Sequence, residues 1–249
     1  MKKQAKPFLS IIIPCYNEEK RIIKSVNKIT EYINLKKLDT ELIFINDGST
    51  DKTKEVLSNL RNIFSNDKFV IIKIVSCKNN YGKGHAIKRG IVSSTGKYIL
   101  LCDADLSTPI TELDKLMMYV DNYDLAIGSR KNKDSIITKP QSHLRTSLGK
   151  TYSFISRVVL DVPLTDFTCG FKLIRTKVAK MIAEKMSINR WAYDSELLKI
   201  AAIHNFRIKE VGIIWQNDPH TKVKLSRDII TSLKDLIKIR INSLFNKYD

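Results

Sequence analysis

Short apolar segments that alternate with helical segments constrain the fold of this chain more than any other feature. The apolar segments are rich in β-branched and aromatic residues, which is typical of strands buried on both faces of a parallel sheet. They cover residues 8–13, 41–45, 69–75, 97–102 and 124–127. Helical periodicity covers 18–33, 51–63 and 81–94, and returns after Pro109. This order predicts right-handed βαβ units, and therefore an α/β fold with a mostly parallel sheet flanked by helices.

The alternation weakens after Arg130. Residues 131–141 are polar, and we expect a mobile loop there. A helix is expected over 142–160, followed by a glycine-containing segment at 166–174 and two further helical stretches. Because no repeat, low-complexity tract or clear linker interrupts the chain, we expect one domain over residues 1–249.

Positive charge is the second constraint. The 249 residues include 43 Lys+Arg and 26 Asp+Glu, so the formal net charge is +17. Hydrophobic residues make up 43% of the chain, which is ordinary for a globular protein and argues against disorder. A charge this positive indicates an anionic partner, which is a nucleic acid, an anionic membrane leaflet or a phosphorylated substrate. Composition alone leaves these three open.

The apolar runs of the sequence are short. None approaches the roughly 20 residues that span a bilayer. Residues 1–7 are basic, but Pro14 interrupts the apolar stretch behind them, so we expect no signal peptide. The four cysteines show neither CxxC nor zinc-site spacing, and we expect them to be free thiols in a reducing cytosol.

Polar residues directly follow the predicted strands, and doubly wound sheets bind their ligands at these carboxyl ends. Asp103 and Asp105 come directly after the segment 97–102. Two carboxylates this close repel each other at low dielectric, and Mg²⁺ or Mn²⁺ is the natural compensating cation. The structural alternative is a helix-capping aspartate beside a solvated one. For residues 46–51 the structural alternative is an Asx turn before a helix.

Three segments that follow successive strands resemble, in order, the motifs of family 2 glycosyltransferases. They are Ser10–Glu19, Asn46–Asp51, which is similar to the DDGSxD turn, and Asp103–Asp105, which is similar to the metal-binding DxD. The resemblance implies the glycosyltransferase A-type nucleotide-binding fold. The residues implied to contact the base and ribose of a nucleotide-sugar donor are Pro14, Tyr16, Glu18 and Asp47. Asp103 and Asp105 are implied to hold the donor's diphosphate through Mg²⁺ or Mn²⁺.

A narrower resemblance covers nearly the whole chain. Five segments resemble the dolichyl-phosphate β-glucosyltransferases and their polyprenyl-phosphate relatives, namely 80–86, 103–109, 128–130, 166–172 and 190–197. Two positions depart from the patterns of related groups. Asn46 replaces the first Asp of the usual DDGS, and Ser107 stands where the mannose synthases carry a metal-coordinating Gln. The second departure argues against GDP-mannose as the donor.

The resemblance implies an inverting transferase that moves a hexose, with glucose from UDP-glucose favoured, onto a polyprenyl (dolichyl-type) phosphate. Residues 1–128 are then the nucleotide-sugar-binding half, 129–226 the acceptor half and 227–246 a C-terminal helix. One alternative is a family 2 enzyme that acts on a saccharide or glycolipid hydroxyl. The other is a basic nucleic-acid-binding protein without catalysis, which leaves the carboxylates at the strand ends unexplained.

The acceptor in this hypothesis is a phosphate monoester, which is already ionised at neutral pH and needs no strong base. Catalysis then requires in-line positioning and a stabilised leaving group. Arg130 and Arg145 are our candidates for binding the acceptor phosphate, because a guanidinium can bond two phosphate oxygens. We expect Lys83 to meet the donor's phosphates and Asp166 to orient the acceptor or the sugar. Together with Asp103 and Asp105, Asp166 and Arg130 form the candidate catalytic set.

Residues 227–246 read as a basic amphipathic helix. Apolar residues such as Leu233 and Ile241 share one helical face, while Lys234 and Lys238 fall on another. Such a helix can lie in the headgroup region of an anionic membrane, and we expect a protein that is peripheral on the cytoplasmic face. The alternative is that the helix packs its apolar face on the domain itself.

Overall fold

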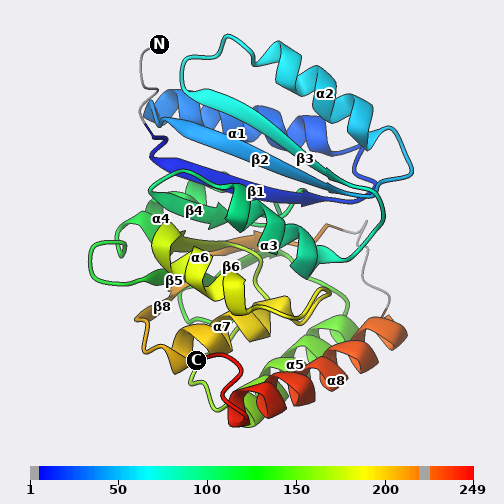
Figure 1. Ribbon diagram of the computed structural model, residues 1–249, viewed down its shortest axis with the longest axis vertical. Helices are drawn as coiled ribbons and strands as arrows, with labels where there is room; N and C mark the ends of the chain where they lie inside the picture. The colour runs from blue at the N-terminus through cyan, green and yellow to red at the C-terminus, as the bar shows by residue number, and fades with distance from the viewer. Residues whose placement is uncertain (1–5, 219–224) are drawn as a thin grey trace.

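A seven-stranded sheet with the order β3-β2-β1-β4-β7-β5-β8 forms the centre of the computed structural model, which describes residues 6–218 and 225–249 (Figure 1). The strands are β1 (Leu9–Cys15), β2 (Thr40–Asp47), β3 (Val70–Cys77), β4 (Tyr98–Leu101), β5 (Leu125–Ser129), β6 (Ile136–Lys139), β7 (Lys172–Arg175), β8 (Ile208–Gly212) and β9 (Ile214–Gln216). The helices are α1 (Ile22–Lys36), α2 (Thr53–Ile63), α3 (Lys83–Ser93), η1 (Ile110–Glu112), α4 (Leu113–Met117), α5 (His143–Leu160), α6 (Thr176–Lys185), α7 (Tyr193–Ile203) and α8 (Leu225–Leu244).

Strands β3, β2, β1 and β4 are parallel neighbours, and β5 is parallel to β8. Only β7 runs the other way in this sheet, between β4 and β5. The predicted α/β class with a mostly parallel sheet is therefore confirmed. The order of the strands reverses between β1 and β4, which pair with each other. In doubly wound sheets this is where a ligand crevice opens beyond the carboxyl ends.

Alternating side chains of the central strands pack into two apolar layers. Ile11 and Ile13 of β1 join the layer under α1, α2 and α4, while Ile12 joins the layer under α3, α6 and α7. Strands buried on both faces must be apolar on both, and this explains the continuous run of isoleucines. Helices α5 and α8 lie side by side next to α7, at the bottom of Figure 1.

Two features differ from the sequence-based expectations. Residues 131–141, expected to be a loop, contain β6, which pairs in parallel with β9. All four residues of β6 are exposed, so the apolar pattern that reveals a buried strand is absent from it. The helix expected after Pro109 begins as the 3₁₀ turn η1 and continues only as the short α4. The predicted helix at 142–160 is confirmed as α5, and the Ser142 side chain caps it by accepting a hydrogen bond from the Arg145 backbone.

No helix within residues 6–218 and 225–249 combines the length and the apolar character needed to span a bilayer. The expectation of no signal peptide concerns the N-terminus, where residues 1–5 lie outside the described part of the chain.

Candidate active site

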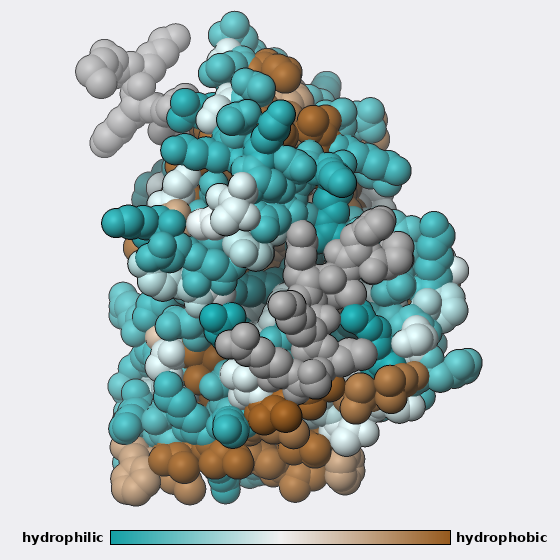
Figure 2. Space-filling model, turned by 90° about the vertical axis from the view of Figure 1, so that its right-hand side faces the viewer, coloured by the Kyte–Doolittle hydropathy of each residue, from teal (hydrophilic) through white to brown (hydrophobic). Residues whose placement is uncertain are grey.

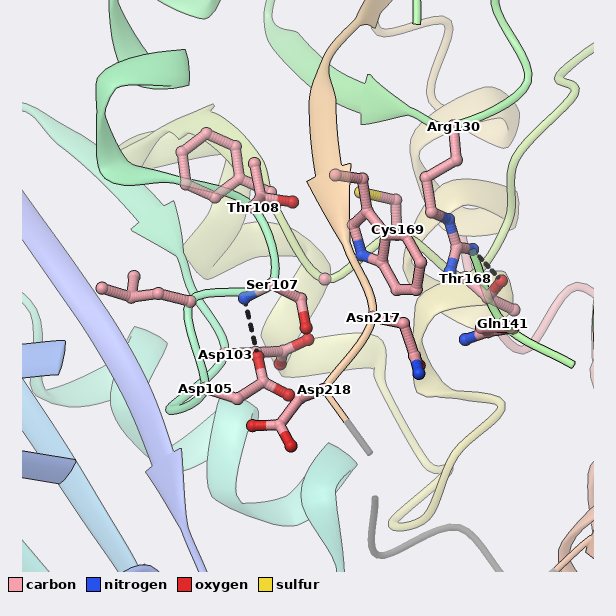
Figure 3. A pocket seen from close by; sticks show the side chains of 14 residues that line it. Asp103, Asp105, Ser107, Thr108, Arg130, Gln141, Thr168, Cys169, Asn217 and Asp218 are labelled. Carbon is pink, nitrogen blue, oxygen red and sulfur yellow. Dashed lines mark hydrogen bonds between the residues drawn. The ribbon is translucent and has the colours of Figure 1, made fainter. Parts of the chain in front are cut away.

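A polar pocket opens beyond the carboxyl end of β4 (Figure 3). It encloses about 120 Å³. Asp103 and Asp105 line it on one side and Arg130, which follows β5, lines it on the other. Gly170 lies against Asp103 so closely that a side chain at position 170 would collide with the Asp103 carboxylate. The fold thus brings the predicted carboxylate pair and a predicted phosphate-binding arginine to one cavity.

Lys83, at the start of α3, forms an ion pair with Asp103, with 2.5 Å between Nζ and Oδ1. Its ammonium group also lies 5.7 Å from the ring centroids of both Trp191 and Tyr193. Burial disfavours the charged amine, but Asp103 and Asp194 outweigh this effect and raise the pKa of Lys83. For Asp103, burial disfavours the carboxylate, and Lys83 outweighs it and lowers the pKa. Both groups are therefore charged at neutral pH.

Asp105 has the opposite electrostatic environment. Burial and the neighbouring charge of Asp103 raise its pKa, although its Oδ1 accepts a hydrogen bond from the Ser107 backbone at 2.9 Å. Asp218 brings a third carboxylate into the same pocket, and Figure 3 shows it beside Asp105. Clustered carboxylate oxygens are the ligands that Mg²⁺ and Mn²⁺ prefer. This donor set fits a hard divalent cation.

Arg130 is held in a fixed orientation by Asp166. The guanidinium donates to both carboxylate oxygens of Asp166, with 2.8 Å for each bond, and the Arg130 backbone donates to the same group at 3.0 Å. The Trp215 ring lies 5.6 Å from the guanidinium carbon. Burial of Asp166 is outweighed by Arg130, which lowers the pKa of the carboxyl far below its usual range. Asp166 is fully buried, so it acts on the pocket through Arg130.

A second buried ion pair lies behind the pocket. Lys172 of β7 donates to the Asp194 carboxylate and to the Cys169 carbonyl, and Lys172 is fully buried. Burial raises the pKa of Asp194, and Lys172 offsets only part of this effect. The Asp194 charge also acts on Lys83, so the two ion pairs are electrostatically linked. The partner of Asp194 is therefore a residue of β7, 22 positions earlier in the chain.

The predicted donor-binding residues lie at the ends of β1 and β2, at the same edge of the sheet. Both oxygens of Asp47 accept backbone hydrogen bonds, from Tyr81 at 3.2 Å and from Gly82 at 2.7 Å. Glu18 is buried and forms an ion pair with Arg21, which also reaches Asp218 at 3.0 Å. Asp47 and Glu18 therefore already hold neighbouring segments in place. Pro14 and Tyr16 are half-buried at the end of β1 and just beyond it.

Asp47 also belongs to a group of potential metal ligands with Cys77 and His85, whose ligand atoms lie within 4.8 Å of one another. Burial and the adjacent Asp47 charge raise the pKa of the Cys77 thiol, which keeps it protonated. A metal requires the thiolate, and the Asp47 oxygens already accept two backbone hydrogen bonds. The geometry favours a hydrogen-bonded cluster over a metal site at these three residues, none of which lines the pocket around Asp103.

The predicted residue Arg145 lies outside the pocket, and three residues that line it in or after β9 were not predicted. Arg145 is on the first turn of α5 and does not line the pocket around Asp103. Trp215, Asn217 and Asp218 do line it and were not among our candidates. They lie in β9 or directly after it, so the rule that selected Asp103 would have selected Asp218 had β9 been recognised as a strand. The Gln216 backbone donates to the Ser107 carbonyl at 2.8 Å and fixes this segment beside Asp105.

The family model for glycosyl transferase family 2 matches residues 10–182. The chain belongs to this family. The matched region begins in β1 and includes Asp103, Asp105, Arg130 and Asp166. The predicted glycosyltransferase activity is confirmed, and the alternative of a non-catalytic nucleic-acid-binding protein is ruled out.

Curated relatives narrow the family. The chain is 34% identical over 248 residues to a protein of Dictyostelium discoideum named dolichyl-phosphate beta-glucosyltransferase, covering 95% of this chain and 75% of the relative. It is 30% identical to the human protein of the same name, with 95% and 76% covered. The predicted resemblance to the dolichyl-phosphate β-glucosyltransferase group is therefore confirmed.

Solved structures support the fold. Glucosyl-3-phosphoglycerate synthase from Mycobacterium tuberculosis, crystallised with Mn²⁺, UDP-glucose and phosphoglyceric acid, is similar with a TM-score of 0.64 and 18% identity, covering 93% of this chain and 80% of that chain. A complex of the same enzyme with phosphoglyceric acid gives a TM-score of 0.66. The predicted glycosyltransferase A-type fold is confirmed.

Replacing Asp105 with Asn tests the cation site. The variant removes one of the two predicted ligands without changing the shape of the side chain, so we expect Mn²⁺ affinity to fall at least about ten-fold. Electron paramagnetic resonance of free Mn²⁺ measures this directly. Because the pKa of Asp105 is raised and a metal needs the ionised carboxylate, wild-type affinity should decline with falling pH sooner than for an ordinary aspartate.

The matched control is Asp121→Asn, which neutralises an exposed aspartate. It should bind Mn²⁺ as the wild type does. Equal Mn²⁺ affinity in Asp105→Asn and Asp121→Asn, with both variants folded by circular dichroism, would remove Asp105 from the cation site.

Proposed function

We propose that this enzyme transfers glucose from UDP-glucose to a polyprenyl (dolichyl-type) phosphate at the surface of a membrane, with inversion at the anomeric carbon. One observation carries the proposal. A cation held in a fixed orientation, Arg130, and a pair of carboxylates, Asp103 and Asp105, line the same small pocket. This arrangement suits an acceptor phosphate on one side and the cation-bound diphosphate of a donor on the other. The names of the relatives support glucose and dolichyl phosphate.

The acceptor side needs orientation more than it needs a base. A phosphate monoester carries most of its charge at neutral pH, so its oxygen attacks without losing a proton to the protein. Arg130 would bind this phosphate through Nη1, because Asp166 holds Nε and Nη2 and the Thr168 hydroxyl accepts a second bond from Nη2 at 2.6 Å. Arg145, on the first turn of α5, would meet the same phosphate or its neighbouring lipid headgroups.

The donor side lies at the ends of β1, β2 and β4. Pro14, Tyr16, Glu18 and Asp47 would contact the base and ribose. A divalent cation, Mg²⁺ or Mn²⁺, would be held by Asp103 and Asp105 and would stabilise the charge of the leaving diphosphate. Lys83 is close enough to Asp103 to share that task, since its amine already lies at the carboxylate. Direct displacement by the lipid phosphate then converts an α-linked donor into a β-linked product.

An exposed apolar surface on α5 and α8 supports a membrane partner. Figure 2 shows it as a brown band along the lower edge of the molecule. The exposed residues that form it are Leu144, Phe154 and Val158 of α5 with Ile230, Ile237, Ile241 and Leu244 of α8. Exposed cations accompany it, among them Arg157, Lys234 and Lys238. A contiguous apolar band flanked by positive charge fits the interface of an anionic bilayer.

The two hypotheses for the C-terminal helix, packing on the domain and binding a membrane, involve different faces of α8. Leu236 and Ile239 are buried in the apolar layer shared with α6 and α7, as a helix packed on the domain requires. Ile237 and Ile241 are exposed by 58% and 45%, which leaves a second apolar face for lipid. We place the enzyme on the cytoplasmic face of its membrane, since its free cysteines and positive charge suit that side.

The decisive experiment supplies UDP-[¹⁴C]glucose, Mn²⁺ and a phosphopolyprenol in detergent. We expect label to enter a chloroform-extractable glucosyl phospholipid, and we expect Arg130→Gln to reduce kcat/KM for the lipid at least about 100-fold, because the charged contact to the acceptor phosphate is lost.

Two controls sharpen this result. Free polyprenol without the phosphate should accept no label. Transfer to a free sugar or to a glycolipid hydroxyl, with none to the phosphopolyprenol, would contradict the proposal and favour the second kind of family 2 enzyme.

Charge substitutions on the apolar band test the membrane surface. We expect the double variant Phe154→Asp, Ile237→Asp to lose at least about ten-fold in binding to vesicles that contain anionic lipid, because each apolar side chain would be withdrawn from the interface. Co-sedimentation measures the bound fraction. Ile63→Asp is the matched control, since Ile63 is 72% exposed at the end of α2. If the double variant and Ile63→Asp bind equally well, the band is not the membrane surface.

A further inference from the structure

Glu196 of α7 is a fully buried carboxylate that the mechanism above does not use. Its two oxygens accept hydrogen bonds from the backbone of Ser187 at 3.0 Å and of Ile188 at 2.8 Å, and from the Ser187 hydroxyl at 2.8 Å. Both partners belong to the segment 186–192, which joins α6 to α7. A buried carboxyl group that accepts several backbone hydrogen bonds fixes such a segment firmly. We call this segment the α6–α7 loop.

The α6–α7 loop packs directly against the first turn of α3. The backbone of His85 donates to the Asn189 carbonyl at 3.0 Å. Gly82 has a φ of 111°, and a Cβ there would lie 2.5 Å from the same carbonyl oxygen, while a Cβ on Gly84 would collide with the Ile188 carbonyl. Glycine at both positions lets the two backbones touch. Lys88, one turn further along α3, donates to the Met186 carbonyl at 2.8 Å.

The start of α3 in turn positions two donor-side groups. Lys83 lies between Gly82 and Gly84 and reaches Asp103. The backbone of Gly82 donates to Asp47 at 2.7 Å. A displacement of the α6–α7 loop therefore moves the amine that faces Asp103 and releases one of the bonds that hold the Asp47 carboxylate.

The other end of this chain of contacts is Tyr248, which follows α8. Its side chain is 1% exposed, and its hydroxyl donates to Glu196 at 2.9 Å. The Asn242 amide donates to the same hydroxyl at 3.4 Å. The Tyr248 carbonyl is hydrogen-bonded to the His204 ring at 2.7 Å. The segment after α8 is thus anchored to the helix that carries Glu196.

We propose that Tyr248 and Glu196 are positioning residues for the donor side of the active site. The contacts run from Tyr248 to Glu196, from Glu196 to the α6–α7 loop, and from that loop to Lys83 at the start of α3. They link α8, whose outer face carries the apolar band, to the donor pocket. The inference rests on the proposed function for its kinetic readout, but the contacts themselves are independent of the substrate.

The test is Tyr248→Phe, which removes the hydroxyl and keeps the ring. Loss of one hydrogen bond to a carboxylate should loosen the loop, and we expect the Kd for UDP with Mn²⁺ and the KM for UDP-glucose to rise about three- to ten-fold. The KM for the lipid phosphate should stay within about two-fold of the wild type. Glu196→Gln, which weakens every bond to the loop, should raise the same two constants further.

The matched control is Tyr152→Phe. The Tyr152 hydroxyl is hydrogen-bonded to Ser195, the neighbour of Glu196 on α7, at 3.1 Å, so this variant also removes a tyrosine contact to α7 but leaves the α6–α7 loop untouched. It should lower thermal stability about as much as Tyr248→Phe and leave UDP affinity unchanged. Equal weakening of UDP binding in both tyrosine variants, or unchanged UDP binding in Tyr248→Phe, overturns the inference.

Hydrogen exchange separates this inference from the proposed function. The amide of His85 should exchange faster in Tyr248→Phe than in the wild type or in Tyr152→Phe, whatever the substrate is. If the wild type binds no UDP, the proposed function fails, and faster exchange at His85 still supports the positioning role. Unchanged exchange at His85 overturns it.

Discussion

Buried and half-buried ion pairs at the carboxyl end of the sheet are the constraint on which the rest of this structure depends. Lys83 with Asp103, Arg130 with Asp166 and Lys172 with Asp194 place three cations and three carboxylates around one small pocket. A charge withdrawn from water is costly unless a partner compensates it, and breaking such a pair leaves the other member uncompensated. These pairs therefore fix the loops that follow β4 and β5 and precede β7.

The same pairs prepare the pocket for anionic substrates. Asp166 accepts three hydrogen bonds from Arg130 and so holds its guanidinium in place. The Asp166 backbone in turn donates to the Glu210 carboxylate of β8 at 2.9 Å. The guanidinium then has little freedom to lose when a phosphate arrives, which strengthens binding. Among residues 6–218 and 225–249 no cation forms an ion pair with Asp105, and burial together with the Asp103 charge raises its pKa, which marks the place where a cation would be stabilising. Part of the net positive charge of the chain is therefore placed at the pocket, where Arg130 is oriented to bind a phosphate.

Much of this was predictable because local sequence encodes it. Continuous apolar runs identified β1 to β5, and polar residues directly after β4 and β5 identified Asp103, Asp105 and Arg130.

The remaining features depend on contacts between distant segments. Strand β6 is exposed on every residue and exists through its pairing with β9, so Asp218 was missed with it. Lys172 and Asp194 look like ordinary surface residues in the sequence, and only the packing of β7 against α7 makes them a pair. Nothing local to Tyr248 indicates that it reaches Glu196.

The central claim is that buried carboxylates act on substrates through the cations they hold, and a double-mutant cycle on Arg130 and Asp166 tests it most directly. The measurement is kcat/KM for the phosphopolyprenol in Arg130→Gln, in Asp166→Asn and in the double variant, each checked for a folded state by circular dichroism. The account predicts that the two single losses are similar and that the double variant is hardly worse than either, because both changes disable one unit. Losses that multiply in the double variant would show that Asp166 acts independently of Arg130 and would contradict the account.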